Sequence, residues 1–566
     1  MATRLHAGGV RSAPADSSEA INIGGLLSDF AARQPDRAAV MVAKGLGSKF
    51  NIRGPSYAQL DADSNRIARG LRDRGLNVGD RVCLFVRPGV ELIAITFALM
   101  KAGAVPVLID PGMGRKSMLS CVERMQPRAF IGIPLAHALK RVFPRVFRTV
   151  ELSVTVGTRW FWGGTTLAEL LQTRDDSRFV EEMTSTQEAA ILFTSGSTGP
   201  AKGVTYTHST FGAQIRALRE LYDFQDGEVD AACFPLFALF SPGLELTCVF
   251  PEMDPSKPAS CDPERIVESI QRAEATSTFG SPAIWQRVVP WCIERSVKLP
   301  SLRRVLIAGA PVSPELVAGF HKVLVGDADV HTPYGATESL PVSSISGREI
   351  LERAQQTAGR AVGTCVGKPA AGIDLQLIRI DDSAQREWSS KRIVPAGEMG
   401  EICVRGDVVT REYKFQEEQT DLAKIGTGKE LRHRIGDVGY FDAQGNLWFC
   451  GRKSHRLETA AGLVMPVPTE VLFNSTPRVH RTALVGVGER GMERPVLIVE
   501  PERGALPMSE KMRQKFIEEL RAHVQGMSGV APIEHFLFHP SFPVDVRHNA
   551  KIHRGDLKRW AEEQLA

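Results

Sequence analysis

The sequence predicts an α/β protein with a large N-terminal domain of layered βαβ sheets, a small β subdomain, and a mobile α+β C-terminal domain. Three observations support this prediction. Apolar strand-like runs alternate with helical segments before about residue 361, short β-rich runs separated by Gly/Asp turns follow, and a compact mixed pattern returns after Gly451. The chain has 566 residues, which is room for several domains of about 100–200 residues each.

The first elements form a βαβ pattern. Apolar residues fall near one face from Tyr57 until Gly75 ends the run, which predicts a helix. The segment 81–86 reads as a buried strand, 91–102 as a helix and 105–109 as a second strand. Strand, helix and strand at this spacing predict a parallel sheet.

The same alternation recurs further along the chain. The segment 189–193 predicts a strand before a glycine-rich loop, 265–273 predicts a helix, and 304–307 predicts another strand. These segments extend the layered βαβ architecture toward the middle of the chain.

Changes in composition set the expected boundaries. Residues 1–20 are small and polar and are expected to be disordered. The large domain is expected over 21–450, with the β subdomain at about 361–450. A hinge is expected at 451–455, and the C-terminal domain at 456–566.

Composition excludes some classes of protein. The charged fraction is 24 % and the net charge is +4, from 69 basic and 65 acidic residues, which is too even to indicate nucleic-acid binding. No nucleic-acid-binding module is recognisable. The most apolar stretch runs from Leu92 to Met100 and stops at Lys101, so it is shorter than the roughly 20 residues of a transmembrane helix. No transmembrane segment is therefore expected.

The cysteines and the N-terminus bear on location. The nine cysteines are scattered and none lies in a C-x-x-C pair, which favours reduced thiols and gives no sign of a zinc site. The N-terminus lacks the apolar core of a signal peptide. We expect a cytoplasmic protein.

The strongest local signal is the segment Phe193-Thr-Ser-Gly-Ser-Thr-Gly-Pro-Ala-Lys-Gly203, directly after a predicted strand. Glycines let backbone N–H groups close around phosphate oxygens, hydroxyls add donors, and Lys202 adds a positive charge. A flexible Ser/Gly linker is the alternative, but a linker does not normally follow a buried strand. The segment is not a Walker loop, because Pro200 and Ala201 precede the lysine. The candidate phosphate-binding residues are Thr194, Ser195, Gly196, Ser197, Thr198, Gly199 and Lys202.

Five further motifs follow this loop along the chain. They are Ala308-Gly-Ala-Pro311, Tyr334-Gly-Ala-Thr-Glu338, Gly436-Asp437, Gly451-Arg452 and Arg547-His-Asn-Ala-Lys551. With the loop, they resemble in order the motifs of the adenylate-forming superfamily, which includes acyl-CoA synthetases, firefly-type luciferases and peptide-synthetase adenylation domains. The resemblance covers about residue 25 to the end and implies ATP and Mg²⁺ as cofactors.

The resemblance implies a nucleotide-binding role for several residues. Tyr334 would stack on adenine, beside the segment Gly309, Ala310 and Pro311. Asp437 would hold the ribose hydroxyls and Arg452 would contact the nucleotide from the start of the hinge. An aromatic face suits a purine and a carboxylate suits paired hydroxyls. Taken alone, an Asp-Val-Gly is more often an ordinary turn.

The resemblance also implies the catalytic residues. Thr337 would bond the α-phosphate, Glu338 would help to hold Mg²⁺, and Lys202 and Lys551 would act on developing charge. Lys551 lies in a generally basic tail, so on its own a solvated surface is the simpler interpretation. We interpret His208 as structural.

The sequence departs from the thioester-forming members. The glycine pair after the hinge is replaced by Thr459-Ala460-Ala461, which places side chains where the pantetheine arm needs bare backbone. Ser454 replaces the usual hinge Asp or Lys, and Ala238 stands in place of a histidine common in acyl-CoA synthetases. These changes leave the adenylation motifs intact and put thioester formation in doubt.

One subgroup fits this pattern. The chain is similar to the β-lactone synthetases of bacterial long-chain olefin biosynthesis, which adenylate a 2-alkyl-3-hydroxy fatty acid and let its own 3-hydroxyl expel AMP. The expected partners are such an acid, or a similar long-chain carboxylic acid, and neighbouring enzymes of the same pathway. The apolar residues Phe237, Phe240, Phe279 and Trp285 would suit a lipid chain, although a core role for each is the commoner case. The alternatives are a long-chain acyl-CoA ligase and a non-catalytic acyl or nucleotide sensor.

Overall fold

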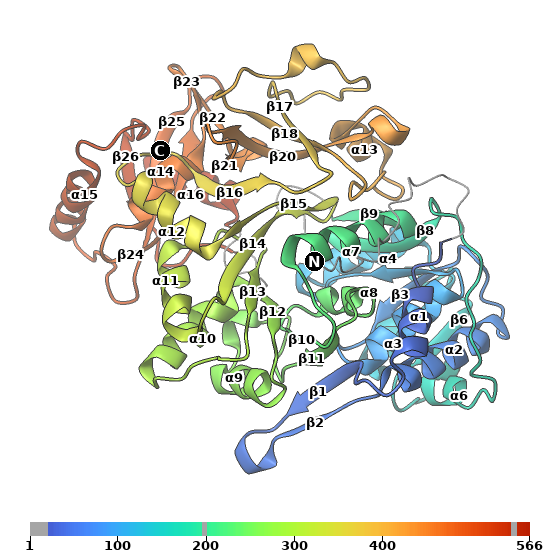
Figure 1. Cartoon of the computed structure of the whole chain (residues 1–566). Coiled ribbons are helices and arrows are strands. Elements are labelled where there is room, and N and C mark those ends of the chain that lie inside the picture. The colour runs from blue at the N-terminus through green and yellow to red at the C-terminus, as the bar shows by residue number, and fades with distance from the viewer. Residues whose placement is uncertain (1–20, 195–200, 545–551) are drawn as a thin grey trace, which may run out of the picture.

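The computed structural model describes residues 21–194, 201–544 and 552–566, and Figure 1 shows their arrangement. In these ranges the strands form two large sheets and two small ones. Parallel pairing dominates one large sheet and, in the other, the strands that come before residue 337 in the chain, as alternating strands and helices require. The predicted α/β fold class is confirmed.

The first large sheet has seven strands in the order β7-β6-β5-β3-β4-β8-β9. All neighbours pair in parallel except β8 and β9, which are antiparallel. The strands are β3 (Arg81–Phe85), β4 (Val105–Leu108), β5 (Ala129–Gly132), β6 (Leu152–Thr155), β7 (Thr165–Thr166), β8 (Glu188–Thr194) and β9 (Lys202–Thr207).

The second large sheet has fourteen strands, thirteen of them in one continuous path. In path order they are β17 (Asp374–Ile378), β18 (Gly400–Arg405), β20 (Arg432–Phe441), β21 (Leu447–Arg452), β16 (Thr364–Pro369), β15 (Ser339–Ser346), β14 (Asp329–Ala336), β13 (Arg304–Ile307), β12 (Ser277–Gly280), β10 (Val229–Ala232), β11 (Thr247–Phe250), β1 (Val40–Lys44) and β2 (Asn51–Arg53), with β19 (Lys424–Ile425) paired to β20. The strands expected in a β subdomain continue this sheet through the antiparallel pairing of β15 with β16.

The last part of the chain has its own sheets. The strands β24 (Val479–Val487), β25 (Arg494–Pro501) and β26 (His535–Phe538) form one, and the hairpin β22 (Leu457–Thr459) and β23 (Gly462–Val464) forms the other. Two apolar clusters, one containing Phe516 and the other Phe542, consist only of buried residues after position 456. Figure 1 shows these elements, coloured orange to red, on one side of the molecule.

Helices cover the large sheets and the C-terminal sheet (Figure 1). The α-helices are α1 (Gly25–Arg33), α2 (Tyr57–Arg72), α3 (Val90–Lys101), α4 (Arg115–Met125), α5 (Pro134–Val142), α6 (Leu167–Leu171), α7 (His208–Tyr222), α8 (Ser241–Leu244), α9 (Pro263–Arg272), α10 (Pro282–Glu294), α11 (Pro314–Val323), α12 (Gly347–Gln356), α13 (Glu417–Ala423), α14 (Pro466–Asn474), α15 (Glu510–Val524) and α16 (Arg554–Leu565).

Local sequence explains where the first helices lie. Ser56 and Gln59 form a capping box at the start of α2, and its apolar residues Leu60, Ile67, Ala68 and Leu71 are buried. The helix α3 is buried over almost its whole length, which accounts for its continuous apolar sequence. Predicted helices and strands between Tyr57 and Ile109 agree with the structure within two residues.

The parallel strands place several motifs at strand ends. In the first sheet, β8 ends at the start of the glycine-rich loop, beside the carboxyl end of β4. In the second sheet, Gly309 follows β13, and Tyr334 lies near the end of its parallel neighbour β14. Ligands of open α/β sheets bind at these carboxyl ends. In the described ranges, no helix combines the length and apolarity needed to cross a membrane.

Candidate active site

The predicted nucleotide residues of the second sheet lie together. Strands β20 and β21 pair so that Asp437 is opposite Arg452, and the guanidinium lies 3.1 Å from the carboxylate of Asp437. Tyr334 donates a hydrogen bond of 2.7 Å to the same carboxylate. Burial, together with the neighbouring charge of Asp437, raises the pKa of the Tyr334 hydroxyl well above its usual value. The tyrosine therefore stays a neutral donor that orients the buried carboxylate.

A second group gathers around Glu338, in the turn between β14 and β15. Tyr413 donates a 2.6 Å hydrogen bond to one carboxylate oxygen of Glu338. The ammonium of Lys202 lies 4.7 Å from the centre of the Tyr413 ring. Burial lowers the pKa of Lys202, and the charge of Glu338 opposes that shift. A lysine, a tyrosine and a carboxylate are thus held in one cluster.

The two large sheets meet at this cluster. Tyr206 on β9 donates a 2.6 Å hydrogen bond to the backbone carbonyl of Thr337. The segment before α13 runs along β9, where Val204 bridges to Tyr413 and the Lys414 backbone N–H donates to the Gly203 carbonyl. Strand β9 of the first sheet is therefore held against the turn between β14 and β15 of the second sheet.

A buried lysine supports the cluster from behind. Lys424 on β19 donates a 2.5 Å hydrogen bond to the Thr410 carbonyl, and the Thr410 backbone N–H donates to the Glu338 carbonyl. Burial lowers the pKa of Lys424 to about 7. His433 lies next to it, and burial followed by the charge of Lys424 lowers the pKa of that imidazole.

Sequence reasoning missed Tyr413 and Lys424. Tyr413 is 75 residues from its partner Glu338, and no spacing rule connects the two positions. A lysine within a short apolar segment, Leu422-Ala-Lys-Ile425, was the available signal for Lys424, because such a lysine is rarely buried without a partner.

The predicted adenine segment forms an exposed turn. Gly309 has φ +94°, a left-handed conformation that glycine adopts without steric cost, and it directs the chain from β13 toward α11. Gly309 and Pro311 are exposed and Ala310 is half-buried. The backbone at this turn can therefore approach a flat ligand.

Some predicted residues lie outside the described part of the chain. Thr194 ends β8, and Lys202 begins β9 after the loop. The described ranges exclude Ser195, Gly196, Ser197, Thr198, Gly199 and Lys551. The roles predicted for these six residues remain predictions.

His208 has a structural place, as its sequence position suggested. It is the first residue of α7, and its Nδ1 accepts a 3.1 Å hydrogen bond from the Ile23 backbone. Burial lowers the pKa of this imidazole to about 4. A neutral histidine joins α7 to the segment before α1.

The predicted apolar residues divide into two groups. The ring of Phe237 stacks on Phe279 at 4.5 Å and contacts Phe240 at 5.7 Å, next to the fully buried Ala238. Trp285 belongs to another core, where it packs against Phe320 at 5.4 Å. The three phenylalanines thus belong to the apolar cluster that contains Ala238, and the tryptophan belongs to another one.

The segment that replaces the glycine pair is a β-turn. Ala460 and Ala461 are the exposed loop residues between β22 and β23, and the Thr459 hydroxyl donates to the Gly462 carbonyl at 2.9 Å. Gly462 adopts φ +118°. The alanine methyl groups project from the tip of this hairpin.

Ion pairs hold the predicted hinge in one position. Lys453 lies 3.0 Å from the Glu401 carboxylate and donates to the Asp381 carbonyl at 2.8 Å. Arg456 and Arg490 both pair with Asp382, at 2.5 and 2.8 Å. These contacts connect the start of the C-terminal elements to β18 and to the segment that follows β17.

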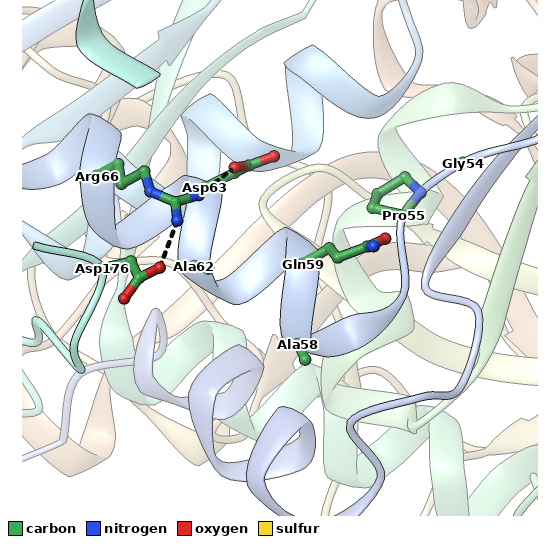
Figure 2. Close-up of a pocket in the computed structure, with 8 residues that line it drawn as sticks. All are labelled: Gly54, Pro55, Ala58, Gln59, Ala62, Asp63, Arg66 and Asp176. Carbon is green, nitrogen blue, oxygen red and sulfur yellow. Dashed lines mark hydrogen bonds and ion pairs between the residues drawn. The ribbon is translucent and has the colours of Figure 1, made fainter. Parts of the chain in front are cut away.

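A surface pocket of about 590 Å³ lies on a different part of the molecule (Figure 2). It is lined mainly by the first turns of α2, where Arg66 pairs with Asp63 and Asp176. None of the candidate site residues lines this pocket. Its charges are already paired with one another, so it offers no unmatched group to a ligand.

The fold and the two clusters together define a class of protein, the adenylate-forming enzymes. The model of the family described as AMP-binding enzyme matches residues 27–414, and the chain belongs to this family. The crystal structure of the anthranilate CoA ligase AuaEII in complex with anthranoyl-AMP has the same fold, with a TM-score of 0.77, 17 % identity and coverage of 96 % of this chain and 98 % of that one.

Curated relatives are similar over nearly the whole chain. Two proteins named olefin beta-lactone synthetase, from Stenotrophomonas maltophilia and Xanthomonas campestris, are 45 % and 44 % identical, each over 96 % of this chain and 98 % of the relative. A long-chain-fatty-acid–CoA ligase from Thermus thermophilus is 24 % identical over 82 % of this chain and 83 % of its own length. The resemblance stated from the motifs is confirmed.

Proposed function

We propose that this enzyme adenylates a 2-alkyl-3-hydroxy fatty acid and then closes it to a β-lactone. A carboxylate oxygen attacks the α-phosphorus of ATP and pyrophosphate leaves. The substrate's 3-hydroxyl oxygen then bonds to the acyl carbon and loses its proton, while the bond from that carbon to the AMP oxygen breaks. Since both reacting ends belong to one molecule, the enzyme supplies proximity by folding the chain into the required conformation.

One comparison supports this function over its main alternative. The relatives named for β-lactone synthesis are 44–45 % identical over nearly the full chain, whereas the acyl-CoA ligase is 24 % identical. A β-lactone synthetase and an acyl-CoA ligase share the adenylation step. They differ in the group that attacks the acyl adenylate, which is the substrate's own hydroxyl in the first and the CoA thiol in the second.

The Tyr334–Asp437–Arg452 cluster supports a nucleotide role for these residues. We assign the Asp437 carboxylate to the ribose hydroxyls, because it is buried and already oriented by a tyrosine hydroxyl and a guanidinium. Arg452 pairs with that carboxylate and adds positive charge beside the phosphates. Tyr334 presents its ring to the adenine.

The Lys202–Tyr413–Glu338 cluster supports a role in phosphate chemistry. Glu338 suits Mg²⁺, because the ion takes hard oxygen ligands and usually binds through one or two carboxylates plus substrate phosphates. Tyr413 fixes the orientation of that carboxylate. Bound Mg²⁺ would supply charge neutralisation of the phosphates. Lys202 and Thr337 would bind phosphate oxygens, and Lys551 would hold the attacking carboxylate.

The tip of the β22–β23 hairpin supports the proposal that CoA is not a substrate. Ala460 and Ala461 carry methyl groups where a pantetheine arm would need bare backbone. The 3-hydroxyl needs no such passage, because it enters with the acyl chain.

The substrate and setting follow from the same proposal. The substrate is a long-chain acid, and enzymes that make this acid or consume the lactone are the expected partners. All nine cysteines are unpaired, which suits a reducing cytoplasmic location.

Product analysis tests the proposal. The enzyme is incubated with ATP, Mg²⁺ and a 2-alkyl-3-hydroxy acid, with and without CoA, and products are identified by mass spectrometry. Lactone at equal yield under both conditions is expected, and acyl-CoA as the main product would contradict the proposal. The matched control is the 2-alkyl acid without the 3-hydroxyl, which should form the acyl adenylate and release AMP only slowly.

A further inference from the structure

An unusual group of apolar side chains is exposed near the edge of the first sheet. In the loop between β6 and β7, Trp160 is 57 % and Phe161 is 75 % exposed. On the nearby helix α5, Leu135 is 74 % and Val142 is 68 % exposed. The last two are seven residues apart, so they lie on the same face of the helix. Large apolar groups gathered in this way mark an interaction site.

The structure holds the loop against α5. Trp162 stacks on His137 of α5 at 5.4 Å, and its indole N–H donates to the Thr155 hydroxyl at 3.0 Å. Trp160 and Phe161 contact the Trp162 ring at 5.2 and 5.5 Å. One aromatic residue therefore anchors the loop, and its two neighbours are presented to solvent.

Positive charge surrounds these apolar groups. The stretch 134–164 contains five basic residues, of which Arg159 pairs with Glu169 at 3.4 Å, and a single acidic one, Glu151. Glu151 pairs with Arg128, outside this stretch, at 3.0 Å. Arg141 lies 5.8 Å from the Phe161 ring, and Arg145 and Arg148 are exposed in the turn that follows α5. We call Leu135, Val142, Trp160, Phe161, Arg141, Arg145 and Arg148 together the aromatic–basic surface.

The topology relates this surface to the active site. The helix α5 follows β5 and the aromatic loop follows β6, so both leave the carboxyl end of the parallel sheet. Strand β8 ends at the same edge. Four strand spacings separate β6 from β8 in the order β6-β5-β3-β4-β8, which is about 19 Å. The aromatic–basic surface and the carboxyl end of β8 therefore lie at the same edge of one sheet.

We propose that the aromatic–basic surface docks the enzyme onto an anionic lipid bilayer. Tryptophan and phenylalanine enter the interface between headgroups and acyl chains, and arginines bind the anionic headgroups. This chemistry favours a bilayer over a protein partner, because it joins bulky aromatics to nearly unopposed positive charge. Docking at this edge brings the site close to the source of a water-insoluble substrate.

Vesicle co-sedimentation tests the proposal directly, with the full chain and no turnover. Binding to vesicles of phosphatidylglycerol and phosphatidylcholine should exceed binding to pure phosphatidylcholine and should weaken as salt rises. The variant Trp160→Ser/Phe161→Ser should bind at least about tenfold more weakly. Each of Arg141→Gln, Arg145→Gln and Arg148→Gln should cost about fivefold, the equivalent of about 1 kcal/mol per basic side chain.

A matched control separates this surface from general exposure. Met492 and Met508 are 64 % and 79 % exposed in the C-terminal part of the chain, so Met492→Ser/Met508→Ser should bind vesicles like the wild type. Circular dichroism and ATP turnover should be unchanged in all these variants.

Three results would overturn the proposal. They are equal binding to charged and neutral vesicles, an equal loss in the methionine control, and self-association that the aromatic variant abolishes in sedimentation velocity without lipid. The last result would assign the surface to a second copy of the chain. Because lipid binding is measured without substrate, its failure leaves the proposed lactone chemistry untouched.

Discussion

At the scale of single residues, the site depends on groups that orient the predicted ones. Tyr334, Glu338 and Asp437 were identifiable from their motifs, but the hydrogen bond from Tyr334 to Asp437 and the donor Tyr413 beside Glu338 were not. Burial keeps both tyrosines protonated by raising the pKa of each hydroxyl. The carboxylates are therefore held by neutral donors that do not compete for the positive charges around them.

Tyr413→Phe should weaken the response to Mg²⁺. The change removes the 2.6 Å hydrogen bond to Glu338 and leaves the ring beside Lys202. Loss of such a supporting bond usually costs about 10–100-fold in metal affinity or activity. The measurement is pyrophosphate release as a function of Mg²⁺ concentration.

Tyr222→Phe is the control for that variant. It removes a 3.2 Å hydrogen bond to Ser344, away from the carboxylates. If both variants keep the wild-type dependence on Mg²⁺, Tyr413 does not orient Glu338 for metal binding.

Lys424→Met should change how stability depends on pH. The pKa of Lys424 is about 7 in the folded protein and 10.5 as its ordinary value, so the unfolded chain binds more protons between these pH values. The wild-type free energy of unfolding therefore gains a contribution that rises from about pH 7 to 10.5. Below pH 7 both states carry the charge and this contribution is constant.

Urea unfolding at pH 7 and pH 9 measures this effect as the difference between wild type and variant. Subtracting the variant's free energy of unfolding from that of the wild type cancels the contribution of the other groups that titrate at high pH. This difference should be more favourable to the wild type at pH 9 than at pH 7 by up to about 2 kcal/mol. A difference independent of pH would mean that Lys424 is charged in the folded state.

At the scale of elements, the sequence predicted what is local and missed what is distant. Apolar periodicity and the Ser56 cap are enough for α2, and the continuous apolar run is enough for α3 and its neighbouring strands. The alignment of the segment around Tyr413 with β9 depends on residues about 200 positions apart. Pairing over such a distance is decided by the assembled sheets, not by any pattern within the segment.

Glycine in place of the hairpin methyl groups tests the role of the β22–β23 tip. In Ala460→Gly/Ala461→Gly the tip becomes bare backbone, so acyl-CoA should become detectable when CoA is added. Lactone formation should change less than about threefold, because the 3-hydroxyl arrives with the acyl chain.

Thr459→Ala is the matched change in the same hairpin. It removes the hydroxyl that donates to the Gly462 carbonyl and accepts from the Ala461 backbone N–H, and it leaves both alanine methyl groups in place. If the glycine variant loses lactone formation while this control keeps it, the methyl groups act in ring closure. They would then do more than block the approach of a pantetheine arm.

At the scale of the whole molecule, two large sheets meet at the site and the C-terminal elements dock beside them. Two apolar clusters of the C-terminal part are separate from those of the large sheets, whereas Met465 packs with Val438 and Cys450 across the boundary. Contacts across the boundary include ion pairs to Asp382 and backbone hydrogen bonds between Ser528 and the 359–361 segment. This arrangement agrees with the expected hinge near Arg452, which remains a prediction.

Asp382→Asn should loosen the docked C-terminal part without unfolding it. Exposed ion pairs are worth about 0–1 kcal/mol, so hydrogen exchange over 453–464 should quicken by up to about fivefold while the global unfolding midpoint stays almost constant. Asp327→Asn, which removes an exposed pair with Arg348, is the control. Equal exchange in the two variants would show that Asp382 does not hold the hinge.

The central claim is that the carboxylate is adenylated and the 3-hydroxyl then closes the ring. Oxygen-18 in the carboxylate of a 2-alkyl-3-hydroxy acid tests it most directly, with AMP and lactone analysed by mass spectrometry. The account predicts one labelled oxygen in AMP and one in the lactone carbonyl, because the bond from the acyl carbon to the AMP oxygen breaks. Unlabelled AMP together with a lactone that keeps both labelled oxygens would mean that the 3-hydroxyl had been activated instead, and would contradict the account.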